Sequence, residues 1–110
     1  MYYELREYQM VLGAGAAEYV KSFENLGLPI MRECGFHLVG AWTTEIGPDA
    51  LTTFAWMLRW ESLDQRADAF QAFRDHPRYA AFTGENSGRV VKVSNRIFRP
   101  ALQEDPAAGN

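Results

Sequence analysis

The sequence is poor in the residues that usually build disulfides, metal centres and redox sites. Its 110 residues include one cysteine, Cys34, and two histidines, His37 and His76. A single cysteine excludes an internal disulfide and suits a reducing compartment, and the two histidines do not have the spacing of a paired metal site. We therefore expect a cytoplasmic protein that holds no metal and needs no cofactor.

Long apolar runs and clusters of basic residues are also lacking. No run approaches the roughly 18 apolar residues of a membrane-spanning helix. The net charge is −3, from 11 basic and 14 acidic residues that are mixed along the chain. Nucleic acid and membranes are therefore not expected as partners. Aromatic residues make up 14% of the chain, which is typical of a ligand pocket or a subunit interface.

Hydrophobic periodicity predicts four β-strands. Apolar residues tend to alternate along four segments, which are residues 1–10, 36–46, 51–60 and 89–99. In the second segment we expect Phe36, Leu38, Gly40 and Trp42 to share one face. Gly40 has no side chain, so it predicts a close approach by another group.

Two helical regions separate these strands. From Ala16 to Cys34 apolar residues recur every three or four positions, and Pro29 predicts a break just before it. The second region is expected to begin at Ser62, which is spaced from Gln65 as in a capping box. A short further helix is expected after Pro77.

The order strand, helix, strand, strand, helix, strand predicts a ferredoxin-like βαββαβ fold of the α+β class. Such a fold is a four-stranded antiparallel sheet with both helices on one face. We expect one domain over residues 1–102 and a flexible tail over residues 103–110. Because the strands are apolar on both sides, we expect an identical chain to cover the other face, giving a homodimer.

Several segments together resemble the NIPSNAP family in their order and spacing. They are residues 3–8, 27–30, 35–40, 44–47 and 54–63. The resemblance spans nearly the whole chain and implies a dimeric α+β barrel, in which two ferredoxin-like chains join sheet to sheet. Trp56 and Trp60 stand where the family often has His and Tyr. The wider superfamily includes cofactor-independent monooxygenases, haem-degrading enzymes, lactone isomerases, cyclases and dehydratases, and chlorite dismutases. The resemblance therefore narrows the architecture more than the reaction.

A polar stripe in the first strand is the best candidate for catalysis. Glu4, Arg6 and Tyr8 alternate along the strand and therefore point to one side. The arginine fork could orient a carboxylate or enolate oxygen, the tyrosine could donate to an oxyanion, and the glutamate could act as a base if its pKa is raised. The alternative is an ion pair on the rim, with Tyr8 packed in the dimer interface.

Candidate substrate-binding residues come from the second and third strands. Trp42, Trp56 and Trp60 could form an aromatic wall for a flat ligand, although tryptophan in strands is more often core or interface. Arg59 could bind an acid, with a surface ion pair as the alternative.

The sequence is interpreted as that of a small-molecule-binding protein, specifically a cofactor-independent enzyme of isomerase, cyclase or monooxygenase type. Its expected substrate is hydrophobic, aromatic or polyketide-like. The alternative is a non-catalytic ligand-binding or protein-interaction module. A deep cavity faced by Arg6 or Tyr8 would favour the enzyme, and a filled interior would favour the module.

Overall fold

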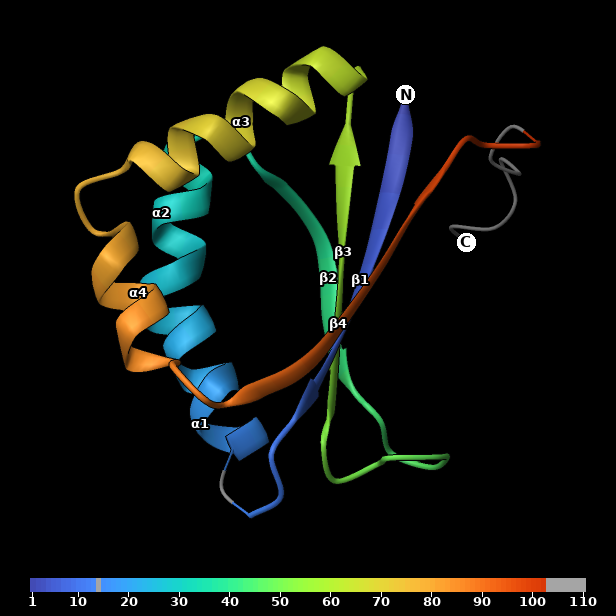
Figure 1. Cartoon of the computed structure of the whole chain (residues 1–110). Coiled ribbons are helices and arrows are strands. Elements are labelled where there is room, and N and C mark those ends of the chain that lie inside the picture. Colours follow the sequence, from blue (N-terminus) through green and yellow to red (C-terminus); the bar gives the residue numbers. More distant parts are fainter. Residues whose placement is uncertain (14, 103–110) are drawn as a thin grey trace.

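The structure is a computed structural model that describes residues 1–13 and 15–102. Its four strands are β1 (Tyr2–Met10), β2 (His37–Thr43), β3 (Thr53–Trp60) and β4 (Val90–Phe98). All neighbours are antiparallel, in the spatial order β2-β3-β1-β4. The predicted ferredoxin-like α+β fold is therefore confirmed (Figure 1). The tail predicted over residues 103–110 lies outside the described residues.

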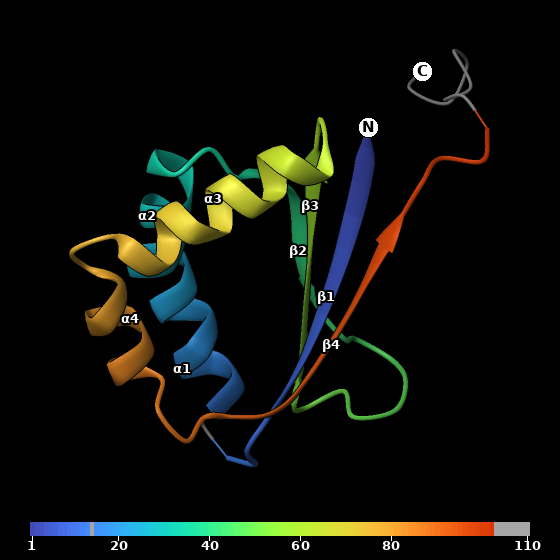
Figure 2. The same ribbon diagram turned by 45° about the horizontal axis from the view of Figure 1, so that its top comes forward.

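The helices all cover one face of this sheet, as the two views show (Figures 1 and 2). They are α1 (Gly15–Ser22), η1 (Phe23–Gly27), α2 (Leu28–Glu33), α3 (Leu63–Asp75) and α4 (Tyr79–Glu85). Within the described part of the chain, no helix combines the length and the apolar character needed to cross a membrane.

The predicted break in the first helical region is a π-helix. The residues on either side of η1, Ser22 and Leu28, both have right-handed helical dihedrals, so the helix continues through it. The backbone N–H of Leu28 donates to the carbonyl of Phe23, five residues back. Pro29 has no N–H to donate, and the wider turn that precedes it accommodates the lost helical hydrogen bond.

Helix α3 begins at the predicted cap. The Ser62 hydroxyl accepts from the backbone N–H of Gln65 at 3.0 Å. The Gln65 side chain accepts from the backbone N–H of Glu61 at 2.9 Å, one residue before the cap. The helix ends at Asp75, and the following residue, His76, is extended because Pro77 disfavours the helical conformation in the residue before it.

The core lies between the sheet and the helices. Strand β3 buries every second side chain against the helices, as its alternation predicts; these are Phe54, Trp56, Leu58 and Trp60. Aromatic rings from the helices meet them edge to face, for example Phe23 with Trp56 at a centroid distance of 5.0 Å. Burial of each such large apolar side chain stabilises the fold by roughly 1.5–3 kcal/mol.

The predicted alternation of β2 is wrong beyond Leu38. A β-bulge at Val39 shifts the register with β3, so that Leu38 and Gly40 pair with consecutive residues. Residues directly opposite in an antiparallel pair share a face. Leu38 therefore faces the helices, whereas Gly40 and Trp42 face the uncovered side. The inserted residue reverses the face to which every later side chain of the strand points. The hydrophobic periodicity of the sequence does not reveal such an insertion.

Strand β4 lies at the sheet edge and is poorly covered by the helices. Its register with β1 places Val93 and Ile97 on the helical side of the sheet. Their side chains are nevertheless 49% and 41% exposed. The space between sheet and helices is therefore open along this edge.

Candidate functional site

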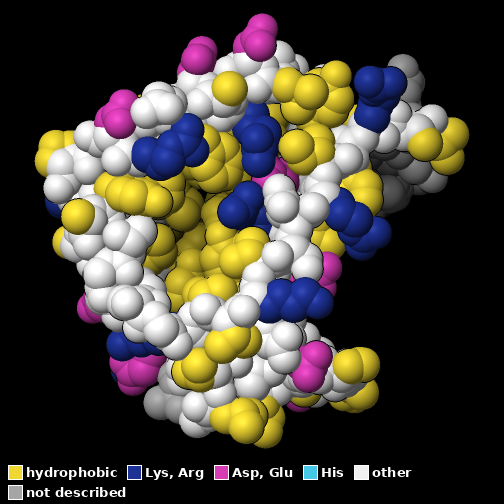
Figure 3. All heavy atoms as spheres, viewed as in Figure 1, with side chains coloured by type: hydrophobic (Ala, Val, Ile, Leu, Met, Phe, Trp, Pro, Cys, Tyr) yellow, Lys and Arg dark blue, Asp and Glu magenta, His cyan; other side chains and the backbone are white. Residues whose placement is uncertain are grey.

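A cavity of about 370 Å³ occupies this open space. Figure 3 shows a hollow with hydrophobic walls between the helices and the strands. Most of its lining is aromatic or aliphatic and comes from Tyr19, Met31, Trp56, Phe70, Phe73, Tyr79, Phe82 and Val90. Its polar lining residues are Arg6, Tyr8, Arg74, Thr83 and Asn86. An apolar cavity with a few polar groups is typical of small-molecule sites.

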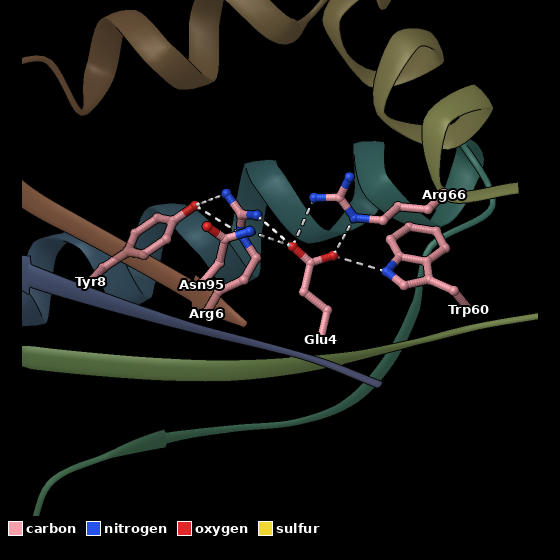
Figure 4. A network of polar contacts seen from close by, with 6 residues as sticks. All are labelled: Glu4, Arg6, Tyr8, Trp60, Arg66 and Asn95. Atoms are coloured by element: carbon pink, nitrogen blue, oxygen red, sulfur yellow. Dashed lines mark hydrogen bonds and ion pairs between the residues drawn. The ribbon is translucent and has the colours of Figure 1, made fainter. Parts of the chain in front are cut away.

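Arg6 and Tyr8 form the polar part of the inner wall. The Arg6 Nε and Nη2 groups donate to the Tyr8 hydroxyl oxygen at 3.3 and 3.1 Å, and Nη1 donates to Glu4 at 2.8 Å (Figure 4). Three of the five N–H groups are thus engaged within the described chain, which leaves two. The Tyr8 oxygen accepts two hydrogen bonds, so its own proton is available to a ligand.

Aromatic rings hold the Arg6 guanidinium in place. Its Cζ atom lies 5.3 Å from the ring centroids of both Trp56 and Phe70. The first of these rings packs on Tyr8 at 5.8 Å. Cation–π contacts of this kind are strongest away from water. Burial works against the charge on Arg6, but neighbouring Tyr8 and Glu4 raise its pKa, so it remains a cation.

Glu4 is the fully buried anchor of this arrangement. Its carboxylate accepts from Arg66 at 2.7 and 2.9 Å, from Trp60 at 3.0 Å and from Asn95 at 3.1 Å, in addition to Arg6. These donors come from β1, β3, β4 and α3, so a single carboxylate joins the sheet to the helical layer (Figure 4).

The pKa of Glu4 is lowered to about 2. Burial by itself raises this pKa, but the hydrogen bonds from Arg66, Trp60, Arg6 and Asn95 outweigh the effect. A general base would need a raised pKa, whereas the pKa of Glu4 is lowered. The carboxylate oxygens already accept hydrogen bonds from the donors around them. Glu4 is suited to position Arg6, not to accept a proton from a substrate.

The charge of the site is positive. Glu4 lies between Arg6 and Arg66, so two cations share one anion. No aspartate or glutamate lines the described cavity wall, whereas Arg74 does. In an apolar surrounding with low dielectric constant, this excess charge favours an anionic group on a ligand.

The other predicted residues fall in three places. Trp56 lines the cavity, and Trp60 lies behind it, bonded to Glu4. Trp42 lies instead on the uncovered face of the sheet, where its indole packs over Gly40; a Cβ on that glycine would come within 2.7 Å of the ring. The close approach predicted at Gly40 is therefore by Trp42 itself.

Arg59 also lies away from the cavity. It faces the uncovered side of β3, and its Nη2 group donates to Glu61 at 2.8 Å on the surface. This arrangement agrees with the surface ion pair considered for Arg59. The three tryptophans and Arg59 thus do not form one wall.

Sequence reasoning missed Arg66 and Asn95. Arg66 lies three residues after Leu63 and four before Phe70, so it falls within the apolar stripe of α3. An arginine at such a position indicates that a buried acidic side chain lies close to it. Asn95 carries no comparable signal. Only the register between β1 and β4, which places it opposite Arg6, brings it to Glu4.

Metal-ligating side chains do not gather in the described residues: no group of three or more His, Cys, Asp or Glu could hold an ion. His37 is exposed on β2. His76 lies beside Glu33, with its Nε2 atom 3.2 Å from that carboxylate, on the outer side of the helices. Neither histidine lines the cavity.

Comparison with known proteins relates the chain to one family and to a wider fold. The NIPSNAP family model matches residues 3–102. No curated protein matches. The structure of protein Atu4242 from Agrobacterium tumefaciens is 30% identical, with a TM-score of 0.80, over 92% of this chain and 94% of that one. A NIPSNAP domain protein from Burkholderia xenovorans is 24% identical, with a TM-score of 0.83, over 96% and 100%.

A more distant structure shares the fold alone. SnoaB from Streptomyces nogalater, a cofactor-independent oxygenase, is 15% identical, with a TM-score of 0.63 over 96% of each chain. At this identity the likeness concerns the arrangement of strands and helices and carries no residue roles across.

Proposed function

The chain belongs to the NIPSNAP family, and on that premise we propose that it is a cofactor-independent enzyme of isomerase, cyclase or monooxygenase type. Its substrate is a hydrophobic, aromatic or polyketide-like small molecule bound between the sheet and the helices. The observation that carries the proposal is the Arg6–Tyr8 pair on the wall of an otherwise apolar cavity. The fold shared with a cofactor-independent oxygenase adds support.

The proposed chemistry is stabilisation of an enolate. Loss of a proton beside a carbonyl moves negative charge onto the carbonyl oxygen, which the remaining N–H groups of Arg6 and the Tyr8 hydroxyl would bind. Donors placed in advance in an apolar site stabilise such an oxyanion strongly, and one donor is worth about 10²–10³ in turnover. Isomerisation, cyclisation and direct reaction with oxygen can all begin from such an enolate.

The substrate's proton must be acidic, because no carboxylate among residues 1–13 and 15–102 lines the cavity as a base. Glu4 is saturated with donors. Burial raises the pKa of Tyr19, which therefore stays a neutral phenol at neutral pH. A substrate whose proton lies between two carbonyls meets this condition, since it ionises readily once its oxygen is stabilised and gives its proton to a solvent water at the open edge of the cavity.

Two copies are proposed to pair through the uncovered face of the sheet. The centre of that face carries Leu5 and Met57, and the half-exposed Trp42 lies towards its β2 edge. Pairing would bury these side chains and leave the cavity of each chain on the outer side. The single cysteine supports the proposed cytoplasmic location.

The second candidate function is a non-catalytic binding module that uses the same cavity. The observation that favours it is that the carboxylate of Glu4 is saturated with hydrogen bonds and has a lowered pKa, so it does not act as a base. The cavity can still bind a ligand without a base.

Proton exchange separates the two candidates. We would incubate 1-phenylbutane-1,3-dione, an aromatic 1,3-dicarbonyl, with the protein in D₂O and follow loss of the signal of the protons between its two carbonyls by NMR. An enzyme that stabilises the enolate accelerates exchange, and Arg6→Lys slows it; Arg59→Lys, on the other face of the sheet, is the control. Binding without acceleration favours the module, and absence of both contradicts the proposal.

A further inference from the structure

Helix α3 carries three side chains in a row along one face. Arg66, Phe70 and Arg74 are spaced four residues apart, and side chains with this spacing lie on the same side of a helix. Arg66 donates to Glu4, and the Phe70 ring centroid lies 5.3 Å from the Cζ atom of Arg6. Arg74 is the next in the row, one turn beyond Phe70, and it lines the cavity.

Arg74 belongs to the helical wall of the cavity, whereas Arg6 and Tyr8 belong to the strand wall. Helix α3 starts near the end of β3 and leaves the sheet as it runs towards α4, so its second half is separated from β1 (Figures 1 and 2). All three residues nevertheless line the same cavity. The cavity therefore has one cationic group on each of its two walls.

The Arg74 guanidinium has no acidic partner among residues 1–13 and 15–102. Its Nη2 group donates to the side-chain oxygen of Gln71 at 3.1 Å, which is a neutral acceptor. The carboxylate of the next residue, Asp75, accepts instead from the amide nitrogen of Gln71 at 3.0 Å. One of the five N–H groups of Arg74 is thus engaged within the described chain, which leaves four for a ligand.

The other polar groups of the helical wall are occupied. Asn86 uses both of its amide N–H groups and its side-chain oxygen in hydrogen bonds within the protein. The hydroxyl of Thr83 donates to backbone carbonyls of its own helix, with that of Tyr79 at 3.2 Å. Of the polar side chains on this wall, Arg74 is therefore the one that offers donors to a ligand.

The surroundings of Arg74 strengthen its attraction for an anion. The rest of the cavity wall is mainly aromatic and includes Phe73 and Phe82, and no described carboxylate lines it. Figure 3 shows basic side chains at several points around the hollow. Beside apolar groups a charge is less screened than in open solvent, so an anionic group is held more strongly there.

We propose that the substrate carries an anionic group, a carboxylate or a phosphate, on the side of its apolar body opposite to the enolisable carbonyl, and that Arg74 binds this group. The carbonyl oxygen lies at Arg6 and Tyr8, as in the proposed function on which this inference rests. The planar guanidinium fork suits the paired oxygens of either anion. Arg74 is thereby a specificity-determining residue that selects acids over neutral compounds of the same shape.

The test uses three forms of 1-phenylbutane-1,3-dione that differ at the para position of the ring. One carries a carboxylate, one a phosphate, and one the neutral methyl ester of the carboxylate. Because Phe70 contacts Arg6 and one helical turn is about 5.4 Å, a group at the far end of a single aromatic ring can reach Arg74. Isothermal titration calorimetry at neutral pH should show at least one acid binding about tenfold or more tightly than the ester. The stronger acid identifies the anionic group.

Arg74→Gln should weaken binding of the preferred acid about tenfold and leave the ester within about twofold. Arg78→Gln is the matched control. It also removes one exposed positive charge, but Arg78 bonds to Glu33 and does not line the cavity, so all three affinities should stay within about twofold. Both arginines are exposed, so both variants should remain folded, which thermal unfolding checks.

Equal affinity for the acids and the ester would overturn the inference. An acid preference that survives Arg74→Gln, equal weakening of acid and ester by Arg74→Gln, or equal losses in the Arg74 and Arg78 variants would do the same. In each of these cases, binding of the ester with accelerated exchange of the protons between its carbonyls leaves the proposed function standing. If none of the three probes binds, both the inference and the proposed function are wrong.

Discussion

The carboxylate of Glu4 and the guanidinium of Arg6, two residues apart on β1, lie 2.8 Å from each other, yet only Arg6 lines the cavity. Glu4 is enclosed by donors from three other elements and has no exposed surface. The two residues therefore have different roles in the site. Glu4 fixes the position and charge of Arg6, and Arg6 presents donors to a ligand.

Replacing Glu4 by Gln should destabilise the fold by about 3–5 kcal/mol, because Arg6 and Arg66 would then be close together without the anion between them. Urea unfolding at neutral pH measures the loss. Glu61→Gln removes an exposed partner of Arg59 and should cost less than about 1 kcal/mol. Equally small losses of unfolding free energy for both variants would show that the buried contacts of Glu4 contribute little to stability.

Stability should depend on pH through Glu4. The pKa of this carboxyl is near 4.5 when unfolded and about 2 when folded, so its contribution is complete above about 4.5 and is lost as the pH falls towards 2. The size of this contribution is roughly 3 kcal/mol. Urea unfolding between pH 6 and pH 2 should therefore show a smaller decline for Glu4→Gln than for the unchanged protein. Parallel pH curves would be inconsistent with the lowered pKa.

Arg6→Lys should weaken binding of 1-phenylbutane-1,3-dione about tenfold or more while the protein remains folded. Lysine keeps the charge but loses the planar fork that contacts Tyr8 and Glu4 together, and it cannot present two further N–H groups from a fixed plane. Calorimetry gives the affinity and thermal unfolding gives the stability. Unchanged affinity would place Arg6 in the scaffold alone.

Tyr8→Phe should reduce catalysed proton exchange of 1-phenylbutane-1,3-dione about 100-fold, as expected for one lost oxyanion donor. The ring contacts with Tyr19 and Trp56 are retained, but two Arg6 N–H groups lose their acceptor, so the variant should remain folded with a loss of roughly 1–3 kcal/mol in stability. Tyr3→Phe, on the opposite face of the same strand, is the matched control and should keep full activity. Full activity in the Tyr8 variant would remove its hydroxyl from the mechanism.

Sedimentation equilibrium at micromolar concentration should give a mass of about twice 12.5 kDa. Met57→Glu places a charge at the centre of the uncovered face and should yield a folded monomer, since an unpaired charge in an interface is costly. Leu12→Glu changes an exposed leucine in the turn after β1 and should remain dimeric. A monomeric mass for the unchanged protein would contradict pairing through the sheet.

The features that the sequence determines by itself depend on neighbours along the chain. The inward face of β3 follows from its period of two, the start of α3 from the Ser62 cap, and the interruption of the first helical region from the missing N–H of Pro29. The side shared by Glu4, Arg6 and Tyr8 follows in the same way from alternation within β1. Each rests on dihedral preferences or hydrogen bonds between residues a few positions apart.

Only the tertiary structure determined the roles of the side chains of Glu4, Arg6 and Tyr8. Glu4 acquires its low pKa from Arg66 and Asn95, which are 62 and 91 positions away, so nothing near Glu4 in the chain indicates whether it is a base or an anchor. The bulge at Val39 likewise turns Trp42 away from the cavity through its pairing with β3. Protonation and side-chain direction depend on which partners the fold brings within a few ångströms, because hydrogen bonds and desolvation act only at that range.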